Sequence, residues 1–135
     1  METVKKVNQQ SINQFEETNY DLLVKLIETW FIRYNQGGFI YPHKHGSFSW
    51  SCVYYVQVGK EAKSMNGSTY FMKPYDGQIL PDFGSNYLKK SQITAHAQEG
   101  KLLIFPGWLY HGSHPFNGEN DRIIISANSI TELKK

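Results

Sequence analysis

The sequence lacks the features that would place this chain in a membrane, in an oxidising compartment or on a nucleic acid. Its single cysteine, Cys52, excludes an intrachain disulfide and favours a reducing compartment. The longest apolar run, residues 102–105, is far too short to span a bilayer, and the polar N-terminus has no signal-peptide core. The 14 basic residues barely exceed the 12 acidic ones and are scattered, unlike those of a nucleic-acid-binding protein. We therefore expect a cytoplasmic protein that binds neither membrane nor nucleic acid.

Charged residues are also few, at 19%, whereas aromatic residues make up 15% of the chain. A disordered chain shows the opposite balance, so this composition predicts a packed core. The length of 135 residues fits one domain, and no repeat interrupts it. We expect residues 1–27 to form a polar lead-in segment that could be helical, and residues 28–135 to form the folded domain.

Short β-prone segments separated by turn residues dominate the chain after its lead-in. Their length and spacing predict an all-β fold, most economically an antiparallel jelly roll. Residues 21–27 fit a short helix or a strand, and residues 74–92 form the one long loop, a length that is usually functional or mobile. The expected strands are residues 28–35, 39–45, 50–58, 68–72, 93–97, 101–105 and 122–126.

Five histidines are candidates for metal binding. His43 and His45 are two residues apart on an expected strand, so their side chains should lie on the same face. On an inner face the two imidazoles would need a partner such as a metal ion, whereas on an outer face they would meet water. His111 follows an apolar strand and a Pro-Gly turn, which would carry the chain over the mouth of a barrel.

Arginine is scarce, because only Arg33 and Arg122 occur among the 14 basic residues. Arg122 begins an apolar strand, where a lysine-rich chain would have little reason to place it. A guanidinium binds a carboxylate through two parallel hydrogen bonds, which lysine cannot do. The alternative is an edge-strand arginine that pairs with Asp121 or Glu119.

A set of motifs accompanies these residues in a fixed order. The set resembles the Fe(II)- and 2-oxoglutarate-dependent oxygenases, specifically the short prolyl-hydroxylase-like group of phages and bacteria, over about residues 28–130. The matching residues are Trp30, Gly37-Gly38-Phe39, His43-x-His45, Ser51-Cys52-Val53-Tyr54-Tyr55-Val56, Glu99-Gly100-Lys101-Leu102-Leu103-Ile104-Phe105-Pro106, His111-Gly112-x-x-Pro115 and Arg122-x-x-x-Ser126-x-Asn128.

The resemblance implies a double-stranded β-helix, a cupin-like jelly roll that holds Fe(II) in one mouth. His43 and His111 match the first and last iron ligands, and His45 stands where the wider superfamily has a carboxylate. Three neutral imidazoles would still leave open positions on the metal but, unlike a site with a carboxylate, would leave its charge at +2. In the alternative, His45 and His111 bind the metal together with Asp76 or Asp82 from the long loop.

The resemblance also implies a co-substrate site for 2-oxoglutarate. Arg122 would bind the distal carboxylate of 2-oxoglutarate, Ser126 shares its strand face, and Tyr55 takes the position of a phenol that contacts the same carboxylate. Asn128 matches the pattern with no derived role. The implied reaction consumes O₂ and 2-oxoglutarate, releases succinate and CO₂, and hydroxylates a C–H bond of a substrate such as a prolyl or other protein side chain.

Candidate substrate contacts lie around His111. Trp108, Tyr110 and His114 could line the rim of the site, whereas His96 should face solvent. Two other classes remain open: a cupin-like three-histidine dioxygenase that does not use 2-oxoglutarate, and a non-catalytic jelly-roll binding module. A three-histidine zinc hydrolase is also possible, although no general base is evident. A homodimer through the N-terminal segment stays open, and a phage-encoded protein would act in the host cytoplasm.

Overall fold

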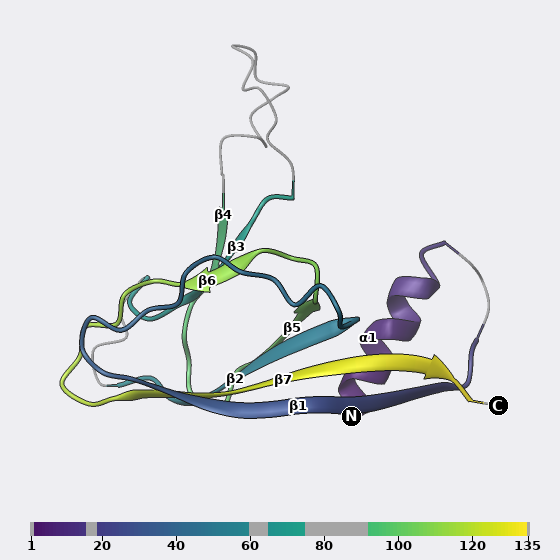
Figure 1. The fold of residues 1–135 in the computed structure, drawn as a ribbon, viewed down its shortest axis with the longest axis horizontal. Coiled ribbons are helices and arrows are strands. Elements are labelled where there is room, and N and C mark those ends of the chain that lie inside the picture. Colours follow the sequence, from purple (N-terminus) through teal and green to yellow (C-terminus); the bar gives the residue numbers. More distant parts are fainter. Residues whose placement is uncertain (1, 16–18, 60–64, 75–91, 135) are drawn as a thin grey trace, which may run out of the picture.

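Two antiparallel sheets face each other in the computed structural model, which describes residues 2–15, 19–59, 65–74 and 92–134 (Figure 1). The larger sheet has the order β1 (Leu22–Tyr34), β7 (Arg122–Leu133), β2 (Trp50–Gln57) and β5 (Leu102–Pro106). The smaller sheet has the order β4 (Gln92–Ala95), β3 (Thr69–Met72) and β6 (His111–Ser113). The expected all-β jelly roll with a short N-terminal helix is therefore confirmed.

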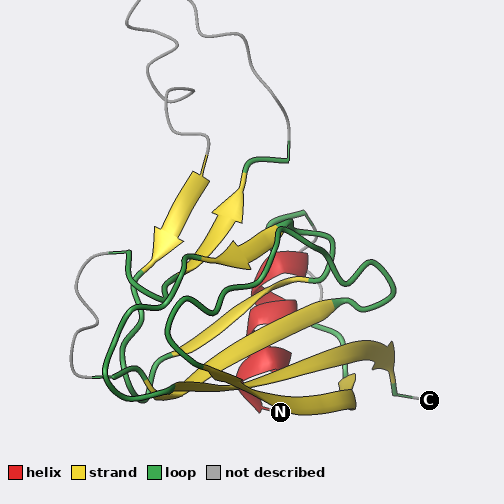
Figure 2. Cartoon of the chain, turned by 60° about the vertical axis from the view of Figure 1, so that its left-hand side comes forward, coloured by secondary structure: helices red, strands yellow, loops and turns green. Residues whose placement is uncertain are grey.

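The helix α1 (Glu2–Ile12) lies on the outer side of the larger sheet, away from the smaller one (Figure 2). Val4 and Asn8 are its buried residues, and Asn8 Nδ2 donates a hydrogen bond to Thr131 Oγ1 of β7 at 3.0 Å. Across the described ranges, no helix has both the length and the apolar character needed to cross a membrane.

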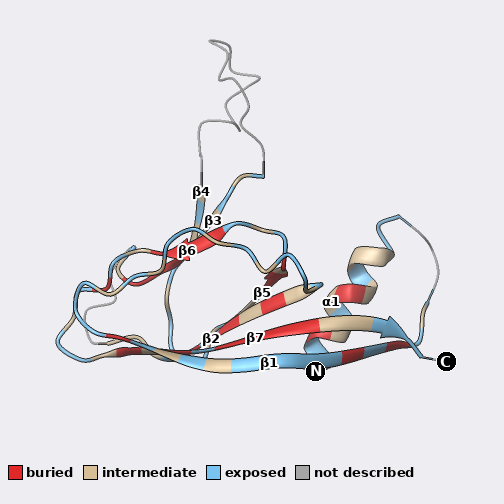
Figure 3. Cartoon of the chain, viewed as in Figure 1, coloured by how far each residue is buried: buried red, intermediate tan, exposed pale blue. Residues whose placement is uncertain are grey.

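The core lies between the two sheets, and strand alternation explains its composition (Figure 3). In β2, Ser51, Val53 and Tyr55 are buried, whereas Cys52 and Tyr54 are more exposed, as the expected inward face required. A strand with one packed face shows this period of two. The buried hydrophobic cluster consists of Tyr34, Val53, Tyr55, Phe105, Phe116 and Ile124.

Several strand boundaries differ from the expected ones. β1 begins at Leu22, so the ambiguous residues 21–27 are mostly strand and the expected boundary at 27/28 falls inside β1. β7 continues to Leu133 because β1 pairs with it along its whole length, well past the expected end at 126. The expected strand at residues 39–45 is wrong: this segment is a loop whose one ladder contact is an isolated bridge between His43 and His111.

Candidate metal centre

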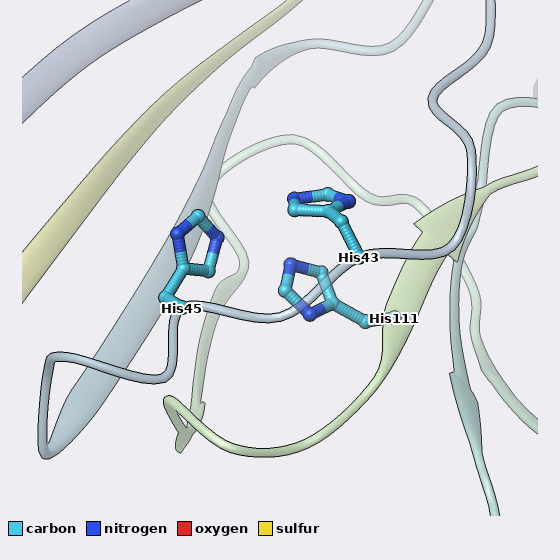
Figure 4. A group of neighbouring side chains, drawn as sticks. All are labelled: His43, His45 and His111. Atoms are coloured by element: carbon cyan, nitrogen blue, oxygen red, sulfur yellow. The ribbon is translucent and has the colours of Figure 1, made fainter.

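His43, His45 and His111 come together in space, and each offers a ring nitrogen within 4.8 Å of those of the other two (Figure 4). The ring centroids are 4.3 Å apart for His43 and His111, 5.0 Å for His43 and His45, and 5.2 Å for His45 and His111. His43 and His45 come from the loop before β2, and His111 begins β6. Such a cluster of imidazoles could hold a metal ion and leave positions open for other ligands.

Backbone hydrogen bonds hold this loop against β6. His43 and His111 exchange both bonds, with N···O distances of 2.9 and 3.0 Å, and the His45 N–H donates to Gly107 O at 2.7 Å. Gly107 is required by this close approach, because a Cβ there would lie 2.1 Å from Phe48 O and 2.7 Å from His45 O. The spacing of the histidines is therefore set by the backbone and not by a regular strand.

Two of the three rings are already oriented for a metal. His43 Nδ1 donates to Tyr41 O and His111 Nδ1 donates to Leu109 O, each at 2.9 Å, which leaves Nε2 as the free ligand atom. His45 differs, because its Nδ1 lies 3.2 Å from Asn128 Nδ2, an amide donor. The rings of His43 and His111 therefore have carbonyl acceptors behind them, and that of His45 has not.

The lowered pKa values of His45 and His111 favour the neutral imidazole that binds metals. Burial lowers the pKa of His111 from 6.5 to about 4; the hydrogen bond to Leu109 opposes this, and the neighbouring histidines add to it. Burial and the charge of His43 lower the pKa of His45, and the carboxylate of Glu28 opposes them. At neutral pH no proton has to leave these two rings before a metal binds.

A cavity of about 140 Å³ lies between the histidines and Tyr34. One wall is formed by β7, whose inward residues follow in the order Asn128, Ser126, Ile124 and Arg122, the first three of which line the cavity. Asn128 contacts His45, and Arg122 is paired with Tyr34 at the opposite end of the row. The cavity thus connects the candidate metal ligands to the region of the arginine.

Arg122 is a buried cation without an acceptor. It is 1% exposed, and none of its three guanidinium nitrogens has a hydrogen-bond partner within the described parts of the chain. Its Cζ lies 4.3 Å from the ring centroid of Tyr34 and 5.2 Å from that of Tyr55. The alternative pairing with Asp121 or Glu119 is absent, because no guanidinium nitrogen of Arg122 has a partner among the described residues and Asp121 binds Arg33. A buried, unpaired guanidinium is costly, so this arrangement calls for an anionic ligand.

Ser126 and the two tyrosines are arranged unequally around this arginine. Ser126 is buried on the Arg122 face and lines the cavity. The Tyr55 hydroxyl donates to Thr69 Oγ1 at 2.7 Å and accepts from Thr69 N at 3.1 Å, so it is occupied by the protein itself. Tyr34 lines the cavity, and sequence reasoning missed it. Only the pairing of Tyr34 with Arg122 between β1 and β7 would have identified it, and strand pairing cannot be read from one sequence.

Four other candidates, Trp108, Tyr110, His114 and His96, do not line the cavity. Trp108 and Tyr110 are 56% and 45% exposed on the segment before His111, and Lys44 Nζ lies 5.3 Å from the Tyr110 ring. His114 follows β6, and its Nε2 is 3.3 Å from Thr94 Oγ1 of β4. His96 is exposed, as expected. Asp76 and Asp82, the alternative carboxylate ligands, lie outside the described residues.

A family model matches most of the chain, and two solved structures share its fold. The model of the family described as "Putative 2OG-Fe(II) oxygenase" matches residues 28–128. An oxidoreductase of the 2OG-Fe(II) oxygenase family from Burkholderia pseudomallei has a similar structure, with a TM-score of 0.61 and 10% identity over 96% of this chain and 57% of that one. A Pseudomonas putida prolyl-4-hydroxylase aligns with a TM-score of 0.52 and 18% identity over 93% of this chain and 60% of that one.

The chain therefore spans less than two thirds of both solved structures. At these identities the two structures show a shared jelly-roll fold only. A search of the curated proteins finds no significant match.

Proposed function

The chain belongs to the 2OG-Fe(II) oxygenases, and from this premise we propose that it is a non-haem iron dioxygenase that uses 2-oxoglutarate to hydroxylate a C–H bond. The observation that carries the proposal is a buried guanidinium without an acceptor, at the far end of the β7 row that walls a cavity beside three converging histidines. A metal ligand set and an anion site at the two ends of one row of inward side chains are what a chelating dicarboxylate needs.

The three histidines fit a resident Fe(II). We propose that His43, His45 and His111 bind it through imidazole nitrogens, since imidazole suits iron and three ligands leave open positions. His43 and His111 keep their rings in place through the carbonyls of Tyr41 and Leu109. When bound, the iron supplies the redox chemistry that converts O₂ and 2-oxoglutarate into succinate, CO₂ and the oxidant for the substrate.

The residues at the other end of the cavity would hold the co-substrate. Arg122 would bind the distal carboxylate of 2-oxoglutarate through parallel hydrogen bonds, and Ser126, on the same face, would lie beside it. Tyr34 would direct its hydroxyl into the cavity, and Tyr55 would orient the guanidinium through its ring. The apolar walls around Ile124 would exclude water from the reacting groups.

For the substrate we propose a peptide or protein side chain, including proline. Two observations support this. The exposed aromatics Trp108 and Tyr110 stand beside His111, as a docking rim for a polypeptide would. The structurally similar Pseudomonas putida protein is a prolyl-4-hydroxylase. The lone Cys52 supports a cytoplasmic location, and a homodimer stays a proposal without a specific contact behind it.

Anaerobic titration of the metal-free chain with Fe(II) and 2-oxoglutarate tests the proposal. Chelation of the keto acid to iron should produce a weak visible charge-transfer band. The band should require far more 2-oxoglutarate, by 100-fold or so, in Arg122→Ala, because a charge-assisted bidentate contact of about 3 kcal/mol is lost. Arg33→Ala is the matched control, since it removes the chain's other arginine from an exposed ion pair.

The outcomes separate the competing functions. A band that depends on Arg122 and not on Arg33 supports the dioxygenase. Iron binding without a band would favour a cupin-type dioxygenase and make Arg122 structural. A chain that binds no iron would be a jelly-roll binding module.

A further inference from the structure

β1 turns its side chains from one face of the sheet to the other at a β-bulge just before Glu28. Ahead of the bulge, Val24 pairs with Thr131, which binds α1, so these side chains lie on the helix face. After the bulge, Glu28 pairs with Asn128, which lines the cavity. Directly paired residues of antiparallel strands share a face, and bulges re-aim side chains in this way. The bulge therefore turns Glu28 toward the metal centre.

Asn128 joins Glu28 to His45. Its Nδ2 lies 3.0 Å from Glu28 Oε2 and 3.2 Å from His45 Nδ1, and its Oδ1 accepts a hydrogen bond from Ser51 Oγ at 2.7 Å. The amide is 1% exposed, so its orientation is determined by these three partners. Trp30, two residues after Glu28, places its ring centroid 5.9 Å from that of His45. Two neighbouring side chains of β1 thus support the same imidazole.

His45 lacks the acceptor for an Nδ1 proton that His43 and His111 have. An imidazole that binds a metal through Nε2 carries its proton on Nδ1, and this proton requires an acceptor. His43 and His111 donate to backbone carbonyls, whereas His45 Nδ1 faces the donor end of Asn128. The carboxylate that accepts from that same amide nitrogen belongs to Glu28, which is exposed on the edge strand β1.

The charge of the site leads to the same residue. A set of three neutral imidazoles leaves a divalent metal at +2, whereas a carboxylate ligand would reduce it to +1. We propose that Glu28 is a positioning residue of the metal centre, which supplies from behind His45 the negative charge and the proton acceptor that a carboxylate ligand would have brought. This inference rests on the proposed function, because it takes the three histidines as the ligand set.

Zinc affinity of the metal-free full chain tests the inference, with Zn(II) titrated against a chromophoric chelator. Glu28→Gln keeps an acceptor oxygen but removes the charge, and it should weaken Zn(II) binding by about tenfold, as loss of such an outer partner does. Glu119→Gln is the matched control, because it makes the same substitution in an exposed turn. Glu28→Asp should recover part of the affinity, since it restores the charge on a shorter side chain.

Nitrogen-15 NMR of the histidine rings gives a readout that a general loss of stability would not mimic. In the zinc-bound wild type, the Nδ1 proton of His45 should be protected from exchange, and Glu28→Gln should reduce that protection, because a neutral amide oxygen is a weaker acceptor than a carboxylate. The Nδ1 protons of His43 and His111 should be unchanged, because their acceptors are backbone carbonyls.

Equal zinc affinity of Glu28→Gln and Glu119→Gln, within about twofold, would overturn the inference and leave the proposed function intact. An unchanged Nδ1 signal of His45 in Glu28→Gln would overturn it as well. A wild type that binds no zinc would remove the ligand set itself and with it both proposals. Because the titration contains no 2-oxoglutarate, a failure of the co-substrate site cannot produce any of these results.

Discussion

Acid should destabilise the metal-free protein through His111 in particular. The pKa of this buried ring is about 4 in the folded chain against an ordinary 6.5. Between these two values the unfolded chain binds a proton that the folded chain does not, so the free energy of unfolding falls as the pH falls from about 6.5 toward 4. The difference of 2.5 in pKa corresponds to at most about 3.4 kcal/mol, of which about 2.5 kcal/mol should be lost between about pH 7.5 and pH 4.5.

Urea unfolding in the presence of a chelator measures this loss at several pH values. The same series on His111→Gln removes the titrating ring, so subtracting it cancels the contribution of the carboxylates, which both proteins share. His96→Gln is the control, because it removes an exposed histidine and should leave the pH dependence of the wild type unchanged. If the wild type and His111→Gln lose equal stability on acidification, His111 is not held neutral by burial and the reasoning is refuted.

Two further substitutions separate the roles of neighbouring residues. Gly107→Ala should cost about 1–3 kcal/mol of stability and weaken metal binding, because its Cβ would collide with backbone oxygens. Gly46→Ala, in the loop before β2, is the control because its Cβ meets nothing within 4 Å, and denaturant unfolding and metal titration compare the two. Tyr55→Phe should destabilise the fold by about 1–3 kcal/mol, because it removes the hydrogen-bond partner of buried Thr69. It should also change the affinity for 2-oxoglutarate less than Tyr34→Phe does. A larger change in Tyr55→Phe than in Tyr34→Phe would return the co-substrate role to Tyr55.

Much of the fold follows from alternation along single strands. The inward row of β2 and the shared face of Arg122 and Ser126 on β7 are visible in the sequence, because a strand buried on one face repeats every two residues. The histidine set was also predictable, but only from the order of the motifs. Neither feature requires knowledge of which strands are neighbours.

The features that the sequence did not predict all depend on pairing. Tyr34 faces Arg122, and Glu28 faces Asn128, through the register of β1 against β7, and that register shifts by one residue at the bulge. A single residue of register reverses the face of every side chain beyond it, and no local pattern records the shift. β6 was missed for a related reason, since its three residues are held as a strand by β3 and not by their own propensity.

The loop at residues 39–45 explains why the wrong secondary structure still led to the right cluster. In a strand, residues two apart project in parallel, about 6.7 Å from each other. That distance separates the backbones, and two imidazoles on one face can still turn toward a common ion, so a strand and this loop both allow His43 and His45 to be ligands. In the structure their ring centroids are 5.0 Å apart and their ligand atoms lie within 4.8 Å, and the loop backbone is held by the bridge to His111 and the bond to Gly107. A small decrease in the distances between the ring nitrogens then suffices for metal coordination. The His-x-His motif specifies the side chains of the centre but not the loop backbone that holds them.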